Sequence, residues 1–164
     1  MYTVARLARA VKRGHFTEDN VSKVRVLVIC IHNSARSQMT EELLRKYGGD
    51  LVEVASAGLQ PGSINPVVVE LLGEDGIDIS AKQTQDVAEL HRSGASFDYV
   101  IAVCDPQAAE RCPIFPAEKK RLHWPLPDPS AATGTREEKL AYVRPIRDRI
   151  RKEVLGFLET LRHE

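Results

Sequence analysis

The sequence lacks several features that would assign it to a class at once. It has no run of about 18 successive apolar residues, which a membrane-spanning helix needs, and its first residues alternate basic with apolar side chains, unlike the apolar core of a signal peptide. It has no net charge, because 23 basic residues balance 23 acidic ones, so no overall field attracts nucleic acid or an anionic membrane. We therefore expect a cytoplasmic protein that binds neither nucleic acid nor a membrane.

Cysteine is scarce as well, with three residues in a chain of 164. An odd number of cysteines makes a poor disulfide framework, and in a reducing compartment such residues are more often catalytic, metal-binding or buried in the core. Cys30, Cys104 and Cys112 also lack the local pair of ligands that is typical of a zinc site. Their positions along the chain must therefore indicate their role.

The hydrophobic pattern predicts strands that alternate with helices in a single domain. Apolar, β-branched runs predict strands at residues 24–29, 51–55, 97–103 and 122–124. Helical spacing and capping signals predict helices over residues 39–47, 66–72 and 136–161. This order is typical of a doubly wound α/β sheet, which we assign to residues 23–164. Residues 1–22 are amphipathic and predict an N-terminal helical extension.

One loop combines a nucleophile with anion-binding groups. It follows the first predicted strand and leads into a helix, so its backbone amides can form a nest at the helix N-terminus, where a tetrahedral oxyanion fits. Arg36 can add a bidentate fork to the anion, and the same cationic surroundings favour the thiolate form of Cys30. Ser37 is placed to hydrogen-bond that sulfur or to hold the loop. The residues expected to bind the oxyanion are Cys30, Ile31, His32, Asn33, Ser34, Ala35 and Arg36.

Three further polar residues share the position of Cys30 in the predicted fold. Ser56, Cys104 and Asp128 also lie at or just after the ends of strands, and ligands of α/β sheets bind at this rim. The alternative is structural: Cys30 is then an inert buried thiol, and Arg36 is a surface cation. We expect the His32 side chain to point to solvent, because one histidine without a visible partner carries little information.

The segment Val-Leu-Val-Ile-Cys-Ile-His-Asn-Ser-Ala-Arg-Ser resembles the active-site signature of the low-molecular-weight tyrosine phosphatase superfamily, and its arsenate reductase branch fits best. The resemblance covers roughly residues 24–161. It implies a three-layer α/β/α fold with a four-stranded parallel sheet. Beyond the signature it is carried by Ser56 to Gly58, Gly76 to Ser80, Cys104, Cys112 with Pro113, His123 with Trp124, and Asp128 with Pro129.

The resemblance implies a thioredoxin-coupled relay through the three cysteines. Cys30 attacks arsenate, Cys104 then attacks Cys30 and expels arsenite, and Cys112 attacks Cys104. An external dithiol, with thioredoxin as the implied donor, reduces the final disulfide. Asp128, held between two prolines, is the implied general acid. The structural alternatives are a buried strand-end residue for Cys104, an incidental loop thiol for Cys112 and a solvated turn residue for Asp128.

Two other functions remain open at this point. A phosphatase would hydrolyse phosphate monoesters through a phosphocysteine at Cys30, and a redox sensor would bind an anion without turnover. Phosphatases of the superfamily commonly have aromatic residues after the Asp-Pro pair, where this chain has Ser130, Ala131 and Ala132. That departure favours a small inorganic oxyanion such as arsenate or phosphate as the ligand.

Some reductases of this branch hold a potassium ion beside the loop, so the resemblance also raises a cation site. The matching oxygen donors are Asn33, Glu41, Ser56 and Asp86. Hard oxygen ligands suit such an ion, although each of these residues also has an ordinary capping or surface role. We expect no other cofactor, and either a monomer or a homodimer. Residues 1–22 are expected to pack on the domain or on a second subunit; the alternatives are docking to a reductant protein or, less favoured, to a membrane surface.

Overall fold

Four parallel strands form the centre of the molecule. The computed structural model describes residues 22–104 and 114–164. The strands are arranged in the order β2-β1-β3-β4, and every neighbouring pair is parallel. They comprise β1 (Val24–Cys30), β2 (Val52–Gly58), β3 (Tyr99–Ala102) and β4 (Lys120–His123).

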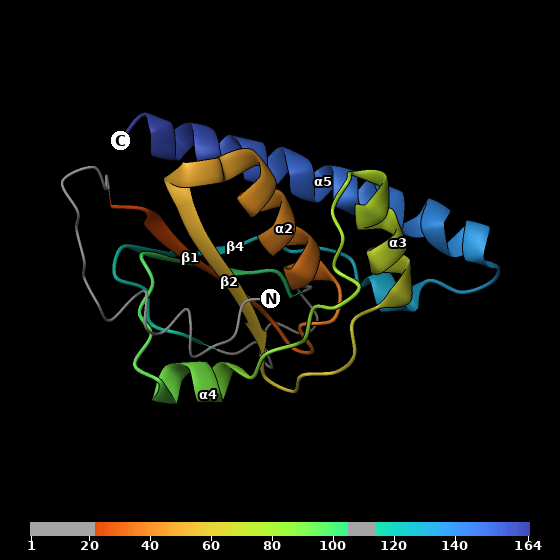
Figure 1. Cartoon of the computed structure of the whole chain (residues 1–164), viewed down its shortest axis with the longest axis horizontal. Coiled ribbons are helices and arrows are strands. Elements are labelled where there is room, and N and C mark those ends of the chain that lie inside the picture. The colour runs from red at the N-terminus through yellow and green to blue at the C-terminus, as the bar shows by residue number, and fades with distance from the viewer. Residues whose placement is uncertain (1–21, 105–113) are drawn as a thin grey trace.

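Helices cover both faces of this sheet (Figure 1). Helices α2 (Arg36–Gly48), α3 (Pro66–Glu74) and α5 (Arg136–Arg162) lie on one face, and α4 (Val87–Arg92) lies on the other. Short 3-10 turns at Gly49–Leu51 and Pro129–Ala131 lead into β2 and towards α5. The arrangement confirms the predicted three-layer α/β/α fold around a four-stranded parallel sheet.

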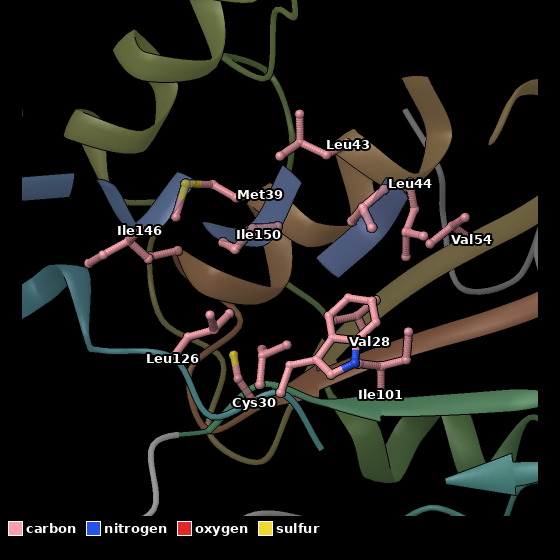
Figure 2. Close-up of a cluster of buried hydrophobic side chains, with 14 of the residues drawn as sticks. Val28, Cys30, Met39, Leu43, Leu44, Val54, Ile101, Leu126, Ile146 and Ile150 are labelled. Carbon is pink, nitrogen blue, oxygen red and sulfur yellow. The ribbon is translucent and has the colours of Figure 1, made fainter. Parts of the chain in front are cut away.

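Strand β1 contributes to a core on each face because successive side chains of a strand point in opposite directions. Val26 and Val28 belong to the larger cluster, which includes residues of α2 and α5, whereas Leu27 and Ile29 belong to the smaller cluster beneath α4. All four side chains are buried, and burying one such side chain stabilises the fold by about 1.5–3 kcal/mol. Cys30 ends the strand at the edge of the larger cluster, so a rigid strand holds its sulfur (Figure 2).

The predicted elements occur with shifted ends. The strand predicted over residues 24–29 also includes Cys30, and the strand predicted over residues 51–55 extends through Gly58. Asn65 caps α3 by accepting a hydrogen bond from the Val67 amide, as the sequence predicted. Helix α4 was missed, because six residues are too few for helical periodicity to be recognised.

Two sequence predictions fall outside the described residues. The helical extension assigned to residues 1–22 lies there except for its last residue, and Cys112 lies there too. Both assignments therefore stay predictions. Within residues 22–104 and 114–164, no helix combines the length and the apolar character needed to cross a membrane.

Candidate active site

The sulfur of Cys30 is held between two hydrogen-bond donors at the end of β1. It lies 3.0 Å from the Ser37 hydroxyl oxygen and accepts the Asn33 backbone N–H at 3.0 Å. The residue is a free cysteine and only 3% exposed. The predicted contact with Ser37 is confirmed. These two contacts hold the sulfur in a fixed position at the start of the loop.

Asn33 organises the loop around this sulfur. Its φ of 54° lies in the left-handed region, which asparagine tolerates better than most residues. The buried amide nitrogen donates to the hydroxyl oxygens of Ser37 and Ser56, both at 2.8 Å. The amide oxygen accepts from the Gln85 backbone N–H at 2.9 Å and from the Gln38 side chain at 3.0 Å. Because the Gln85 N–H can only donate, it fixes which end of the Asn33 amide is oxygen.

The fixed amide sets the direction of the hydrogen bonds that follow. Its nitrogen only donates, so the oxygens of Ser37 and Ser56 act as acceptors towards Asn33. The Ser56 hydroxyl then donates to Glu41 Oε1 at 2.5 Å. Because the Ser37 oxygen likewise accepts from Asn33, its hydroxyl hydrogen is free to be donated to the Cys30 sulfur. We therefore assign Ser37 as the donor in this contact.

A buried, charged carboxylate ends the chain of hydrogen bonds. Glu41 is 1% exposed, and its Oε2 lies 2.6 Å from Arg45 Nη2 and 2.7 Å from Lys82 Nζ. Burial by itself would raise the pKa of Glu41. The charges of Lys82 and Arg45, together with hydrogen bonds from Lys82 and Ser56, outweigh that effect and hold the pKa below its ordinary value. Glu41 is thus an anion at neutral pH and a fixed acceptor for Ser56.

Arg36 connects the loop to the segment that carries Asp128. It is 7% exposed and begins α2, and its Nη1 donates to the Leu126 carbonyl oxygen at 3.0 Å. Leu126 belongs to the same buried cluster as Cys30 (Figure 2). Two residues further on, Asp128 accepts the Ser130 N–H at 2.9 Å and caps the 3-10 turn. The structure thus ties the predicted general acid's segment to the predicted anion-binding loop.

The start of α2 is suited to an anion. Among the described residues, no side chain caps this helix: its N-cap position is occupied by Ala35, which offers no acceptor. The first backbone N–H groups of a helix need an acceptor, and the helix dipole favours a negative one. Arg36 is the first residue of this helix, so a helix start and a cationic side chain arise from the same point of the chain, an arrangement that can bind a tetrahedral oxyanion.

Cys104 lies on the neighbouring strand end. Val103 donates its backbone N–H to the Ile29 carbonyl at 3.0 Å, so residues 30 and 104 leave adjacent strands at the same rim of the sheet. Cys104 is fully buried in the cluster that contains Cys30, and it is disulfide-bonded. The His123 ring nitrogen Nε2 lies 2.9 Å from the Cys104 carbonyl oxygen. The structure thus brings together two of the three predicted cysteines.

Of the other residues predicted for the site, two lie in the Asn33 network and two lie outside it. Ser56 and Glu41 join Asn33 in one network, whereas Asp86 caps α4 by accepting the Ala88 N–H at 2.8 Å. His32 is exposed, as predicted, with its Nδ1 3.1 Å from the Gln60 carbonyl oxygen.

Sequence reasoning missed the residues that hold the network from outside the loop. Lys82 and Gln85 lie between α3 and α4, where no periodic pattern marks them. Leu126 acts through its backbone carbonyl, so its residue type gave no signal. Gln38 offered one: it is a polar residue directly after the loop, and it proves to be completely buried.

The chain is similar to known proteins in sequence and in fold. The model of the family described as low molecular weight phosphotyrosine protein phosphatase matches residues 25–164. An arsenate reductase of Bacillus licheniformis is 41% identical over 143 residues, covering 85% of this chain and 99% of the relative. An arsenate reductase of Bacillus subtilis is 40% identical over 135 residues, covering 82% and 95%. A solved thioredoxin-dependent arsenate reductase of Corynebacterium glutamicum is similar with a TM-score of 0.63 and 28% identity, covering 97% of this chain and 67% of that chain.

Proposed function

The chain belongs to the low-molecular-weight phosphotyrosine protein phosphatase family, and from this premise we propose that it is an arsenate reductase that uses Cys30 as its nucleophile. One observation carries the proposal. The Cys30 sulfur lies between two donors at the mouth of an anion-binding loop, and Cys104 leaves the adjacent strand at the same rim. A nucleophile, an oxyanion cradle and a second sulfur are the parts that reduction of a bound oxyanion by thiols requires.

The first step is formation of a covalent adduct. Arsenate binds to the amides at the start of α2 and to the Arg36 guanidinium, which neutralise its charge. The Cys30 thiolate attacks arsenic, a sulfur–arsenic bond forms, and one arsenic–oxygen bond breaks. Asp128 donates a proton so that this oxygen leaves as water. The contact between Arg36 and Leu126, which ties the Asp128 segment to the loop, supports this role.

The second step moves electrons to arsenic. The Cys104 thiolate attacks the Cys30 sulfur, the electron pair of the sulfur–arsenic bond moves to arsenic, and arsenite leaves. A Cys30–Cys104 disulfide remains, so the two thiols have supplied the two electrons that arsenic gained. The shared rim of β1 and β3 supports this exchange, because thiol–disulfide exchange requires the attacking sulfur to reach the other.

The third step returns Cys30 to its thiol form. Cys112 attacks Cys104, and the thiolate of Cys30 leaves. After this step Cys30 is free and Cys104 is disulfide-bonded, and the states of these two residues in the structure are consistent with it. An external dithiol then reduces the disulfide. We propose thioredoxin as this donor and the cytoplasm as the location, in line with the thioredoxin-dependent structural relative.

Phosphate ester hydrolysis is the second candidate, because the family description names it and the same loop can serve it. In a phosphatase, Cys30 would form a phosphocysteine that water hydrolyses, and Cys104 would have no chemical task. The small side chains of Ser130, Ala131 and Ala132 provide no aromatic surface to hold a phosphotyrosine ring. A reductase with weak phosphatase activity accounts for both features.

Multiple-turnover assays distinguish these functions. Arsenate-dependent NADPH oxidation is measured with thioredoxin and thioredoxin reductase for the intact chain and for Cys30→Ser, Cys104→Ser and Cys112→Ser. We expect activity in the intact chain and none in any variant, with Ser130→Ala as an active control. A phosphatase would hydrolyse an aryl phosphate rapidly and tolerate loss of Cys104 and Cys112. A sensor would form a disulfide without consuming arsenate. Either result would overturn the proposal.

A further inference from the structure

Lys82 places an ammonium group on the buried carboxylate that ends the hydrogen-bond chain from Cys30. Its Nζ lies 2.7 Å from Glu41 Oε2, and Glu41 accepts the Ser56 hydroxyl that Asn33 holds. We propose that Lys82 takes the position of a monovalent cation, so that this loop is completed without potassium. The inference concerns the residues predicted above to bind that ion, and it does not depend on which reaction the loop catalyses.

The first two predicted potassium ligands are already engaged in hydrogen bonds. The Asn33 amide oxygen already accepts from the Gln85 N–H and from Gln38, which orients its nitrogen towards Ser56. An N–H donor repels a cation. The Ser56 oxygen accepts this N–H and donates its own hydrogen to Glu41 at 2.5 Å. While this network is intact, both lone pairs of the Asn33 amide oxygen are used, and the Ser56 oxygen keeps only one for an ion.

The other two predicted ligands are also engaged. Glu41 Oε2 faces the guanidinium of Arg45 at 2.6 Å and the ammonium of Lys82 at 2.7 Å. The Oδ1 atom of Asp86 accepts the Ala88 N–H that starts α4. In the described part of the chain, no group of three or more His, Cys, Asp or Glu residues is placed to hold a metal ion. The donor set that the family resemblance suggests does not fit potassium here.

Charge balance explains what Lys82 supplies. The carboxylates of Glu41 and Glu42 meet the cations of Arg45 and Lys82, and Glu42 Oε1 lies 2.7 Å from both of these cations. Among the described contacts of these four residues, two negative charges meet two positive ones. Removing Lys82 alone leaves one uncompensated negative charge, and Glu41 is only 1% exposed. Arg45 would then face two carboxylates by itself. An unbalanced charge at a buried site is destabilising, and one bound monovalent cation would compensate it.

The position of Lys82 also connects two segments. Glu41 and Glu42 lie on α2, which starts at the anion-binding loop, whereas Lys82 lies in the connection between α3 and α4. The same connection contributes the Gln85 N–H to Asn33. Lys82 is therefore a positioning residue: it neutralises Glu41 and anchors the segment that orients the Asn33 amide.

The test compares the stability of the full chain in potassium chloride and in choline chloride, each at about 100 mM so that screening is equal. We expect the melting temperature of the intact chain to be the same in both salts, and calorimetric titration with KCl to show no binding. Lys82→Met should melt at a lower temperature in choline chloride and regain about 2–4 °C in KCl, because an ion that binds only the folded state stabilises it.

Two further variants distinguish a cation role from simple packing. Lys82→Arg keeps the positive charge and should respond to potassium no more than the intact chain does. Lys152→Met removes a lysine that is exposed on α5 and should show no difference between the salts. Specific binding of potassium to the intact chain would overturn the inference. So would a Lys82→Met variant that is equally stable, or equally unfolded, in both salts.

Discussion

Replacing Asn33 with alanine removes the side chain that connects the Cys30 loop to the rest of the site. That side chain makes hydrogen bonds to Ser37, Ser56, Gln85 and Gln38, at distances of 2.8 to 3.0 Å. Alanine makes none of these bonds. It also has to adopt a φ of 54°, which asparagine tolerates better.

The expected loss of stability follows from these contacts. The partly buried Gln85 N–H is left without its acceptor, which costs up to about 1–3 kcal/mol. Ser37 and Ser56 each lose one hydrogen bond, at about 0.5–1.5 kcal/mol apiece. Gln38 still donates to the Asn33 carbonyl, so its loss is small. With about 1 kcal/mol for the left-handed backbone, we expect Asn33→Ala to lower the free energy of unfolding by about 3–7 kcal/mol.

Urea unfolding measures this loss, followed by circular dichroism for the intact chain and the variant. Asn65→Ala is the matched control, because Asn65 uses its side chain for one cap hydrogen bond at α3, whose removal costs about 1 kcal/mol. If Asn33→Ala loses no more stability than Asn65→Ala, the hydrogen-bond network does not hold the loop as described.

Three further predictions concern the same site. Gly58→Ala would place a Cβ 2.7 Å from the Ile31 carbonyl oxygen and 2.8 Å from the Asn33 backbone nitrogen. It should raise the KM for arsenate and lower the free energy of unfolding by about 1–3 kcal/mol. Gly62→Ala, whose added Cβ has its nearest neighbour at 4.0 Å, should change neither quantity. The pKa of Glu41 is lower in the folded chain than its ordinary value of 4.5, so the unfolded chain binds the proton more readily. The stability that Glu41 contributes is therefore present above pH 4.5 and is lost as the pH falls below that value. Acid unfolding should show this loss in the intact chain and less of it in Glu41→Gln. Equal acid sensitivity of the two proteins would contradict a charged Glu41 in the folded chain. Asp128→Asn should lower kcat for arsenate reduction by about 100-fold or more, measured at saturating arsenate, and an unchanged kcat would exclude Asp128 as the general acid.

The sequence predicts the fold and the reactive loop well because their signals are local. An unbroken apolar run ending at Cys30 indicates a buried strand, and the spacing from Cys30 to Arg36 and Ser37 identifies the loop that follows it. The cap residues Asn65 and Thr135 predict the starts of two helices, and each accepts a backbone N–H in the structure. In each case the interacting groups lie within a few positions of one another.

The supporting network could not be predicted in the same way because its contacts are distant in sequence. Lys82 and Glu42 are 40 positions apart, and nothing in either segment marks them as partners. Likewise, the Gln85 backbone N–H that orients Asn33 carries no residue-type signal. The family resemblance supplied candidate potassium ligands, but the contacts of Lys82 with the buried Glu41 carboxylate come only from the folded chain.

A single-turnover experiment tests the central claim most directly. The fully reduced chain is mixed with arsenate without any external thiol, released arsenite is quantified, and the free cysteines are alkylated and identified by mass spectrometry. We predict about one arsenite per chain, a Cys104–Cys112 disulfide and an alkylated Cys30, because one disulfide supplies the two electrons for one arsenate. Three alkylated cysteines and no arsenite would contradict the proposed relay.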